Sequence, residues 1–436
     1  MNRSRRAINV ATGVLVVGAA CVVLSACRSA IRPIEPVAAS TFPESQVRRG
    51  AVLAAIGDCQ QCHTVPGGRA YAGGLPLKTP FGTIYSTNIT PDVETGIGAW
   101  SREAFMRAMR EGVDQEGVHL YPAFPYDHYT LITDEDGQAL YAYLMTRAPV
   151  HAVAPQNDLR FPFNIRKALV IWKRLYLREG PYQPDTSQSD EWNRGAYLVQ
   201  GLGHCGVCHT PHNALGAEER QHELAGGEAE GWTAYALDRT SPAPVPWDVE
   251  SMAAYLRRGW HADHGVARGP MQSVTADLAS VPESDVRAIA TYVVSRMGER
   301  SPEGNSSSNG AAGGATRTNE SADAEQQPGA AVYDAACASC HDGARPLPFG
   351  GIELGLSTAV HAPDPRNLIN FVLHGLPAEE AEAQPIMPGF AGTMSDQQLA
   401  ALLQYVRERF TTAPAWRDLD QYIKKARDQA GNEEMS

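Results

Sequence analysis

Three copies of a Cys-x-x-Cys-His motif constrain this chain more than any other feature. Two cysteines three positions apart lie on one face of a helical turn, and the histidine follows beside them. This spacing is typical of c-type haem attachment, in which both cysteines bond to one haem and the histidine ligates its iron. The motifs are Cys59-Gln60-Gln61-Cys62-His63, Cys205-Gly206-Val207-Cys208-His209 and Cys337-Ala338-Ser339-Cys340-His341. We therefore predict three covalently bound haems c, with His63, His209 and His341 as axial iron ligands.

Zinc binding and thiol redox chemistry are the alternative explanations. Zinc ribbons pair two Cys-x-x-Cys units about 15–20 residues apart, whereas these motifs begin 146 and 132 residues apart (205 − 59 and 337 − 205). A thioredoxin-like site needs one Cys-x-x-Cys unit and no adjacent histidine. The other two cysteines, Cys21 and Cys27, lie in the N-terminal apolar segment. Haem attachment therefore accounts for all six cysteines of the folded part.

The N-terminus is typical of an export signal. Arg3, Arg5 and Arg6 precede residues 7–26, which carry no charge. Leu24-Ser25-Ala26-Cys27 resembles a bacterial lipobox, so we expect Cys27 to become the lipid-bearing first residue of the mature protein. The alternative is an uncleaved anchor, because about 20 apolar residues suffice to span a bilayer. Both place the chain at the inner membrane, facing the periplasm.

One helical plan surrounds each motif. A short helix leads into the motif, and an amphipathic helix with a capping sequence ends the domain, starting near Thr133, Ser280 and Ser395. A middle helix runs from a tryptophan to a glycine 12 residues later in the first two copies (112 − 100 and 259 − 247). We predict an all-α protein with three tandem class I cytochrome c-like domains and long loops.

The domain boundaries follow from composition. A connection rich in proline precedes the second domain, and a linker of Ser, Gly, Ala, Asn and Glu that we predict to be disordered precedes the third. The predicted parts are a signal peptide, lipoprotein signal or anchor at 1–27, domain 1 at 44–150, the connection at 151–190, domain 2 at 191–300, the linker at 301–330, domain 3 at 331–410 and a polar tail with room for one more helix at 411–436.

Methionines are the expected sixth ligands in domains 2 and 3. Met271 lies 21 residues before Tyr292, and Met387 lies 18 residues before Tyr405 (292 − 271 and 405 − 387). We expect both in an irregular segment ahead of the last helix, where methionine is less often core filler. His/Met ligation raises the reduction potential and closes both faces of the haem, which suits electron transfer and excludes substrate binding at the iron.

Domain 1 departs from this pattern. Phe124 occupies the position where the repeat expects methionine, and phenylalanine cannot ligate iron. His128, four residues later, is one sixth ligand to consider; a five-coordinate or water-bound iron is another. Met106 and Met109 are further alternatives, although their spacing on the middle helix is explained by core packing.

Charge and motifs exclude other classes. The net charge is −12, and no long basic run follows the first six residues, so we expect no nucleic-acid partner. The sequence contains no nucleotide-binding glycine pattern, serine-nucleophile elbow or paired-carboxylate constellation.

The chain resembles the trihaem cytochrome c subunit of bacterial membrane-bound dehydrogenases over residues 44–410, most strongly in domain 1. The resemblance rests on Gly73-Gly74, Thr79-Pro80-Phe81-Gly82-Thr83-Ile84-Tyr85-Ser86-Thr87-Asn88-Ile89-Thr90-Pro91-Asp92, Gly96-Ile97-Gly98 and His119-Leu120-Tyr121-Pro122-Ala123. Such subunits serve quinoprotein alcohol dehydrogenases, flavin-dependent sugar or gluconate dehydrogenases, and some molybdenum hydroxylases.

The resemblance implies an electron-transfer subunit. Its partners would be a periplasmic dehydrogenase, containing molybdopterin with a 2Fe–2S cluster, PQQ or FAD, and ubiquinone or a terminal oxidase. Phe124 departs from the methionine usual in the alcohol and gluconate branches and favours the molybdenum-associated branch. A haem enzyme with an open first iron and a free periplasmic electron shuttle are the competing hypotheses.

Overall fold

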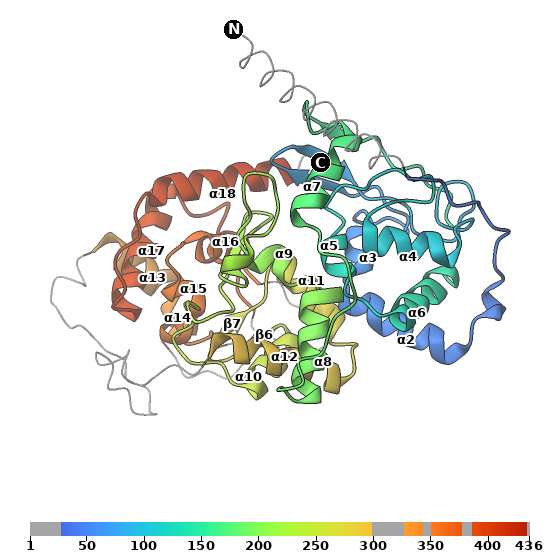
Figure 1. Cartoon of the computed structure of the whole chain (residues 1–436). Coiled ribbons are helices and arrows are strands. Elements are labelled where there is room, and N and C mark those ends of the chain that lie inside the picture. Colours follow the sequence, from blue (N-terminus) through green and yellow to red (C-terminus); the bar gives the residue numbers. More distant parts are fainter. Residues whose placement is uncertain (1–27, 299–326, 343–349, 377–385, 434–436) are drawn as a thin grey trace, which may run out of the picture. The chain divides into compact units, whose positions relative to one another are not determined.

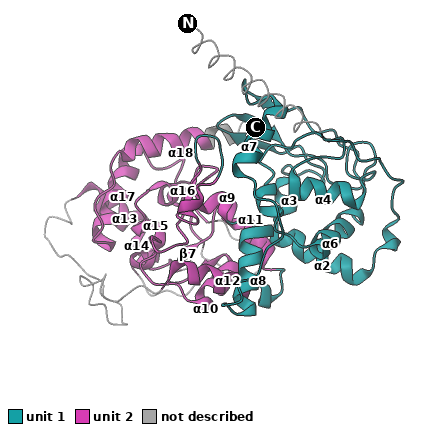
Figure 2. Ribbon diagram, viewed as in Figure 1, with its two compact units in different colours: residues 1–205, 213–217, 280–285 teal, residues 206–212, 218–279, 286–436 magenta. Residues whose placement is uncertain are grey.

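The computed structural model describes residues 28–298, 327–342, 350–376 and 386–433 and is mostly helical, with a few short strands (Figure 1). The predictions for residues 1–27, including Cys27, and for most of the 301–330 linker lie outside the described residues. The chain divides into two compact units (Figure 2). Unit 1 comprises residues 1–205, 213–217 and 280–285, and unit 2 comprises residues 206–212, 218–279 and 286–436.

Unit 1 combines helices with one small sheet. Strands β1, β2 and β3 pair antiparallel in that order. The elements are η1 (Ala39–Thr41), α2 (Glu44–Ile56), α3 (Cys59–Cys62), β1 (Pro76–Thr79), β2 (Gly82–Tyr85), α4 (Arg102–Glu111), α5 (Tyr126–Tyr129), α6 (Asp134–Met145), β3 (Asp158–Leu159), η2 (Arg166–Ala168), α7 (Leu169–Tyr176), α8 (Asp190–Tyr197) and η3 (Leu198–Leu202).

Helices α2 and α6 pack against each other at a glycine. A Cβ on Gly50 would overlap the carbonyl oxygen of Ala139 and lie 2.6 Å from the Cβ of Tyr143, so only glycine permits this approach. The buried carboxylate of Asp136 in α6 accepts a hydrogen bond from Arg49 Nε in α2 at 2.6 Å. The helix that leads into the first motif is thereby fixed against the last helix of domain 1.

The helix starts predicted at Thr133 and Ser395 are present, whereas α12 (Glu283–Met297) begins three residues after Ser280. Thr133 caps α6 by accepting a hydrogen bond from the Asp136 amide, and Ser101 caps α4 in the same way from Ala104. Unit 2 contains a capping box at Ser395 and Gln398, at the start of α17 (Asp396–Phe410). These side chains satisfy amides that have no partner within the helix.

Unit 2 contains most of the remaining elements and two two-stranded hairpins. The elements are α9 (Gly206–His209), η4 (Arg220–His222), β4 (Gly227–Ala229), β5 (Trp232–Ala234), α10 (Val249–Arg258), β6 (Trp260–His261), β7 (Gly265–Val266), α11 (Pro270–Leu278), α12 (Glu283–Met297, which begins in unit 1), α13 (Pro328–Ala336), α14 (Ala338–His341), η6 (Leu354–Leu356), α15 (Thr358–His361), α16 (Arg366–His374), α17 and α18 (Leu419–Glu433).

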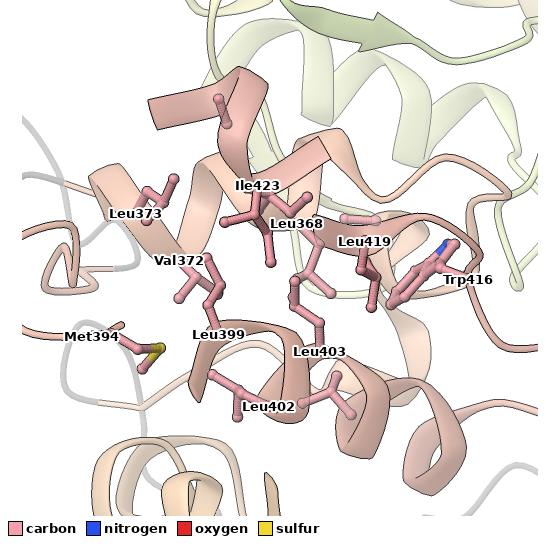
Figure 3. Packing of buried hydrophobic residues seen from close by; sticks show 14 of the residues in the cluster. Leu368, Val372, Leu373, Met394, Leu399, Leu402, Leu403, Trp416, Leu419 and Ile423 are labelled. Carbon is pink, nitrogen blue, oxygen red and sulfur yellow. The ribbon is translucent and has the colours of Figure 1, made fainter. Parts of the chain in front are cut away.

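The C-terminal part of unit 2 has its own hydrophobic core (Figure 3). Helices α16 and α17 contribute Leu373 and Leu399, and α18 contributes Ile423. The segment beyond residue 410, expected to be a polar tail, is part of this core, because Trp416 and Ile423 are buried in it.

The glycine contact of α2 recurs in this part of unit 2. A Cβ on Gly329 in α13 would overlap the carbonyl oxygen of Ala401 in α17 and lie 2.7 Å from the Cβ of Tyr405. Within the described ranges, no helix combines the length and apolar character needed to cross a bilayer.

Candidate haem sites

The cysteines and histidines of the three motifs are at or beside short helical turns. Cys59 and Cys62 bound α3, while His209 and His341 end α9 and α14. All six motif cysteines are partly or fully exposed. Their side chains are therefore open to covalent attachment.

Each motif histidine has the same ring hydrogen bond. The Nδ1 atoms of His63, His209 and His341 lie 2.6, 2.6 and 2.9 Å from the backbone carbonyl oxygens of Thr87, Tyr235 and Ile352. Because a carbonyl only accepts, Nδ1 carries the proton and donates, which leaves the lone pair on Nε2. This is the arrangement that metal-ligating histidines use to fix tautomer and ring orientation.

Burial supports the same ring state at two motifs. It lowers the pKa of His63 and of His209, because desolvation disfavours the charged imidazolium. The neutral imidazole is the form that binds iron.

A glycine stabilises the chain after each motif. Gly73 and Gly226, at φ of 72° and 92°, donate to the carbonyls of His63 and His209, both at 2.7 Å. Gly351 donates to the carbonyl of Cys340 at 2.9 Å. These turns hold each motif against the segment that receives its histidine.

A second set of glycines precedes Phe124, Met271 and Met387, the three positions where the sequence predicts or would place a sixth ligand. Gly112, Gly259 and Gly375 follow α4, α10 and α16 at φ of 60°, 75° and 67°. Each donates to a carbonyl in the last turn of its helix, at 2.9–3.0 Å. Gly112 and Gly259 end their helices in the left-handed conformation, whereas Gly375, with a ψ of −165°, ends α16 in a different positive-φ conformation.

Phe124, Met271 and Met387 each lie 12 residues beyond these glycines (124 − 112, 271 − 259 and 387 − 375). Two of these loops fold back onto their glycine. The Leu120 amide donates to the Gly112 carbonyl, and the Ala267 amide donates to the Gly259 carbonyl, both at 2.7 Å. Phe124 and Met271 each follow this contact by four residues, so they occupy equivalent positions.

The surroundings of the two methionines differ from the sequence expectation in one respect. Met387 lies in an extended segment that exchanges two backbone hydrogen bonds with Leu376, at 2.7 and 3.0 Å. Met271 does not lie in an irregular segment, because it is in the first turn of α11. Pro270 favours a helix start at this point, a signal that the expectation overlooked.

Phe124 packs against aromatic neighbours. Its ring contacts Tyr129 edge-on, with centroids 5.2 Å apart, and it borders the buried cluster that contains Tyr126 and Trp172. Helix packing also accounts for Met109, which is buried in α4, and for Met106, which lies against Gly137.

His128 lies in α5, close to Phe124 in the chain. Its Nδ1 atom is 2.7 Å from the carbonyl oxygen of Gln200. The ring therefore has the same kind of Nδ1 hydrogen bond as the three motif histidines.

Two tyrosines that the sequence did not single out close around the first motif. Burial raises the pKa of Tyr129 well above its usual value. Burial also raises the pKa of Tyr71, whose hydroxyl is hydrogen-bonded to Tyr143 at 3.1 Å. Both phenols stay neutral at any physiological pH.

The chain that enters the second motif contacts the chain that enters the first. His204 Nε2 lies 3.3 Å from the carbonyl oxygen of Gly57, and a Cβ on Gly57 would touch Leu202 and Cys59. These residues all belong to unit 1. Cys59 and the residues before Cys205 are thus neighbours in space.

Within unit 2, strand β5 connects the second motif with α16. Tyr235, whose carbonyl receives His209, directly follows β5. Asn367 of α16 donates to the Thr233 carbonyl at 2.9 Å and accepts from its amide at 2.8 Å. Helix α16 ends at His374, directly before Gly375 and 13 residues before Met387 (387 − 374), so β5 links the carbonyl that receives His209 to the helix that precedes Met387.

Paired cysteines and a tautomer-fixed histidine suit covalent haem c, and they define the class: this chain is a c-type cytochrome. Comparison with known proteins agrees. The family model described as "Cytochrome C oxidase, cbb3-type, subunit III" matches residues 324–406. A nicotinate dehydrogenase subunit of Pseudomonas putida is 46% identical over 409 residues, covering 93% of this chain and 34% of that protein.

Two further relatives match over most of their own length. The fructose dehydrogenase cytochrome subunit of Gluconobacter japonicus is 38% identical, covering 88% of this chain and 83% of the relative. The cytochrome c subunit of alcohol dehydrogenase (quinone) of Gluconobacter oxydans is 36% identical, covering 84% and 78%. The chain belongs to the family of cytochrome c subunits of membrane-bound dehydrogenases and is an electron-transfer subunit of such complexes, as the sequence predicted. It spans about a third of the nicotinate dehydrogenase relative.

Proposed function

We propose that the chain carries three haems c in three tandem class I cytochrome c-like domains, at residues 44–150, 191–300 and 331–410. The observation that carries this proposal is the Nδ1 hydrogen bond to a backbone carbonyl at His63, His209 and His341. Each haem supplies a one-electron iron couple. The chain contributes the two cysteines that attach each haem and the histidine that orients it.

Met271 and Met387 are the proposed sixth ligands in domains 2 and 3. Their support is the 12-residue spacing from Gly259 and Gly375 (271 − 259 and 387 − 375), together with a thioether in both positions. A thioether at each of these irons would give a high-potential site with no open coordination position.

His128 is the proposed sixth ligand of domain 1. Its replacement by alanine should convert the first haem from low-spin to high-spin while the other two stay low-spin. Electron paramagnetic resonance of the oxidised protein measures this change. His151→Ala is the control, because His151 is an exposed histidine of the same unit. A high-spin first haem in the unmodified protein would instead favour a haem enzyme with an open iron.

The three sites are proposed to conduct in series. The contact of His204 with Gly57 supports a short path between the first and second sites, and the Asn367–Thr233 pair supports one between the second and third. Electron transfer needs such proximity, because each step must be short.

We propose that electrons enter from a periplasmic dehydrogenase with molybdopterin and a 2Fe–2S cluster and leave to ubiquinone or a terminal oxidase. Phe124 and the 46% identity to a nicotinate dehydrogenase relative support this partner class. The alternative is a PQQ or flavin dehydrogenase, which the fructose and alcohol dehydrogenase relatives support at lower identity.

Purification of the complex from its native membrane in mild detergent tests the partner. We expect the chain to co-purify with a large subunit and with molybdenum, and addition of that enzyme's substrate should reduce the bound haem. Stoichiometric PQQ or FAD without molybdenum would establish the alternative. A chain that purifies alone and is reduced by no co-purifying enzyme would contradict both.

Membrane attachment is proposed to occur through a lipid on Cys27, at the periplasmic side of the inner membrane. Labelled fatty acid should enter the mature protein and be lost from Cys27→Ala, with Cys21→Ala as the matched control. Equal absence of label from all three proteins would instead favour an uncleaved N-terminal anchor.

A further inference from the structure

Residues 160–178 form an exposed apolar surface on unit 1, here named the α7 surface. Of the ten large hydrophobic side chains that the described residues leave exposed, five belong to it. They are Phe161, Phe163, Ile165, Ile171 and Leu175, with exposed fractions of 79, 40, 45, 52 and 63%. Scattered apolar residues are normal on a protein surface, but a cluster of this kind marks an interaction site.

This exposure is not caused by loose packing of α7. On its inner face Val170 and Trp172 are buried, and the Trp172 indole donates a hydrogen bond to the Leu215 carbonyl at 3.0 Å. Ile171 and Leu175 lie one turn apart and are exposed. The inner face of α7 is therefore packed against unit 1, while apolar side chains on its outer face remain exposed to solvent.

The charge of the α7 surface identifies the occupant. Between residues 160 and 178 the sequence contains six basic residues and no acidic one, in a chain of net charge −12. Lys173 is used internally, since its Nζ donates to the carbonyls of Glu111 and Gly112 at 2.6 Å. The other basic residues are Arg160, Arg166, Lys167, Arg174 and Arg178. Apolar side chains among basic ones match the interface of an anionic phospholipid bilayer.

The start of the described chain lies beside this surface. Arg28 immediately follows Cys27, and its guanidinium pairs with the Glu111 carboxylate at 3.1 Å. The Glu111 carbonyl receives Lys173 of α7. Residue 28 and α7 thus both contact the same end of α4, so the first described residue lies close to α7.

We propose that the α7 surface binds directly to anionic phospholipid, as a second membrane contact in addition to the lipid on Cys27. This inference rests on the membrane attachment proposed above. The inner face of α7 packs against Phe124 through Trp172 and Tyr126. Binding would therefore hold the first haem site at a fixed orientation to the membrane, which a lipid tether alone does not achieve.

Site-specific photocrosslinking of the full, haem-loaded chain tests the proposal. The photoreactive amino acid p-benzoylphenylalanine replaces Ile171 or, separately, Leu175, and the protein is reconstituted in vesicles of phosphatidylcholine with radiolabelled phosphatidylglycerol. Val93 is the matched control position, because it is 50% exposed in the same unit and tethered by the same N-terminus. We expect lipid labelling at 171 and 175 to exceed that at 93 by about tenfold, and Arg174→Glu/Arg178→Glu to reduce it severalfold.

Two results would overturn the inference. One is lipid labelling at 171 and 175 no greater than at 93 in a chain that floats with the vesicles. The chain would then be membrane-attached, but not through contact of the α7 surface with lipid. The other is a discrete protein adduct at 171 or 175 in native membranes, with no lipid adduct, which would assign the surface to a partner protein.

Discussion

Replacing Met387 by leucine should lower the midpoint potential of one haem by on the order of 100 mV and leave the other two unchanged. Leucine has nearly the volume of methionine but lacks the thioether, so packing is preserved while the ligand is lost. The same iron should then bind carbon monoxide in the reduced state. Spectroelectrochemical titration measures the three potentials.

Met394→Leu is the matched control for this change. Met394 lies in the same C-terminal core, only 8% exposed, but not at the position 12 residues after Gly375. Met271→Leu should reproduce the effect at a different haem. Unchanged potentials in both Met387→Leu and Met271→Leu would show that the sixth ligands are wrongly assigned.

Gly329→Ala should destabilise domain 3 by about 2–4 kcal/mol, although alanine is the better helix former. The added methyl group would overlap the Ala401 carbonyl oxygen, so α13 and α17 must separate. Because α13 leads into the third motif, haem attachment at Cys337 and Cys340 should also fall. Denaturant unfolding followed by haem absorbance measures the stability, and haem staining of proteolytic fragments measures the attachment.

Gly392→Ala separates this effect from glycine replacement in general. Gly392 belongs to the same unit, has no atom within 4 Å of its would-be Cβ, and has an ordinary φ. Its replacement should change stability by less than about 0.5 kcal/mol. Equal losses in the two variants would contradict a close contact between α13 and α17.

The motifs and helix starts were predictable because their chemistry is local. A Cys-x-x-Cys-His sequence brings its ligands together within one turn, and Thr133 or Ser395 caps the helix that directly follows it. The close contacts of Gly50 and Gly329 were not predicted, because they depend on a helix many residues away. Trp416 and Ile423 were assigned to a polar tail for the same reason, since only tertiary packing reveals their burial.

In the candidate haem sites, too, local sequence features were predictable and long-range contacts were not. The position of Phe124 relative to the methionines could be inferred from repeat spacing, and the 12-residue distance from Gly112 supports it (124 − 112). The carbonyls of Thr87 and Tyr235 that orient the histidine rings could not be predicted, because every residue has a backbone carbonyl and its side chain does not show which one will accept the bond. Met271 was expected in an irregular segment but lies in α11. This helix start has a local sequence signal, because Pro270 occupies the first position of the helix.

A reductive titration of the purified, oxidised chain tests the central claim most directly. Three covalent haems in one electron-transfer chain predict uptake of three electrons per molecule, with the haem absorbance change complete at that point. Cys205→Ala/Cys208→Ala should take up two, with the first and third haems still attached. Saturation at two electrons or fewer in the unmodified, mature protein would contradict the account.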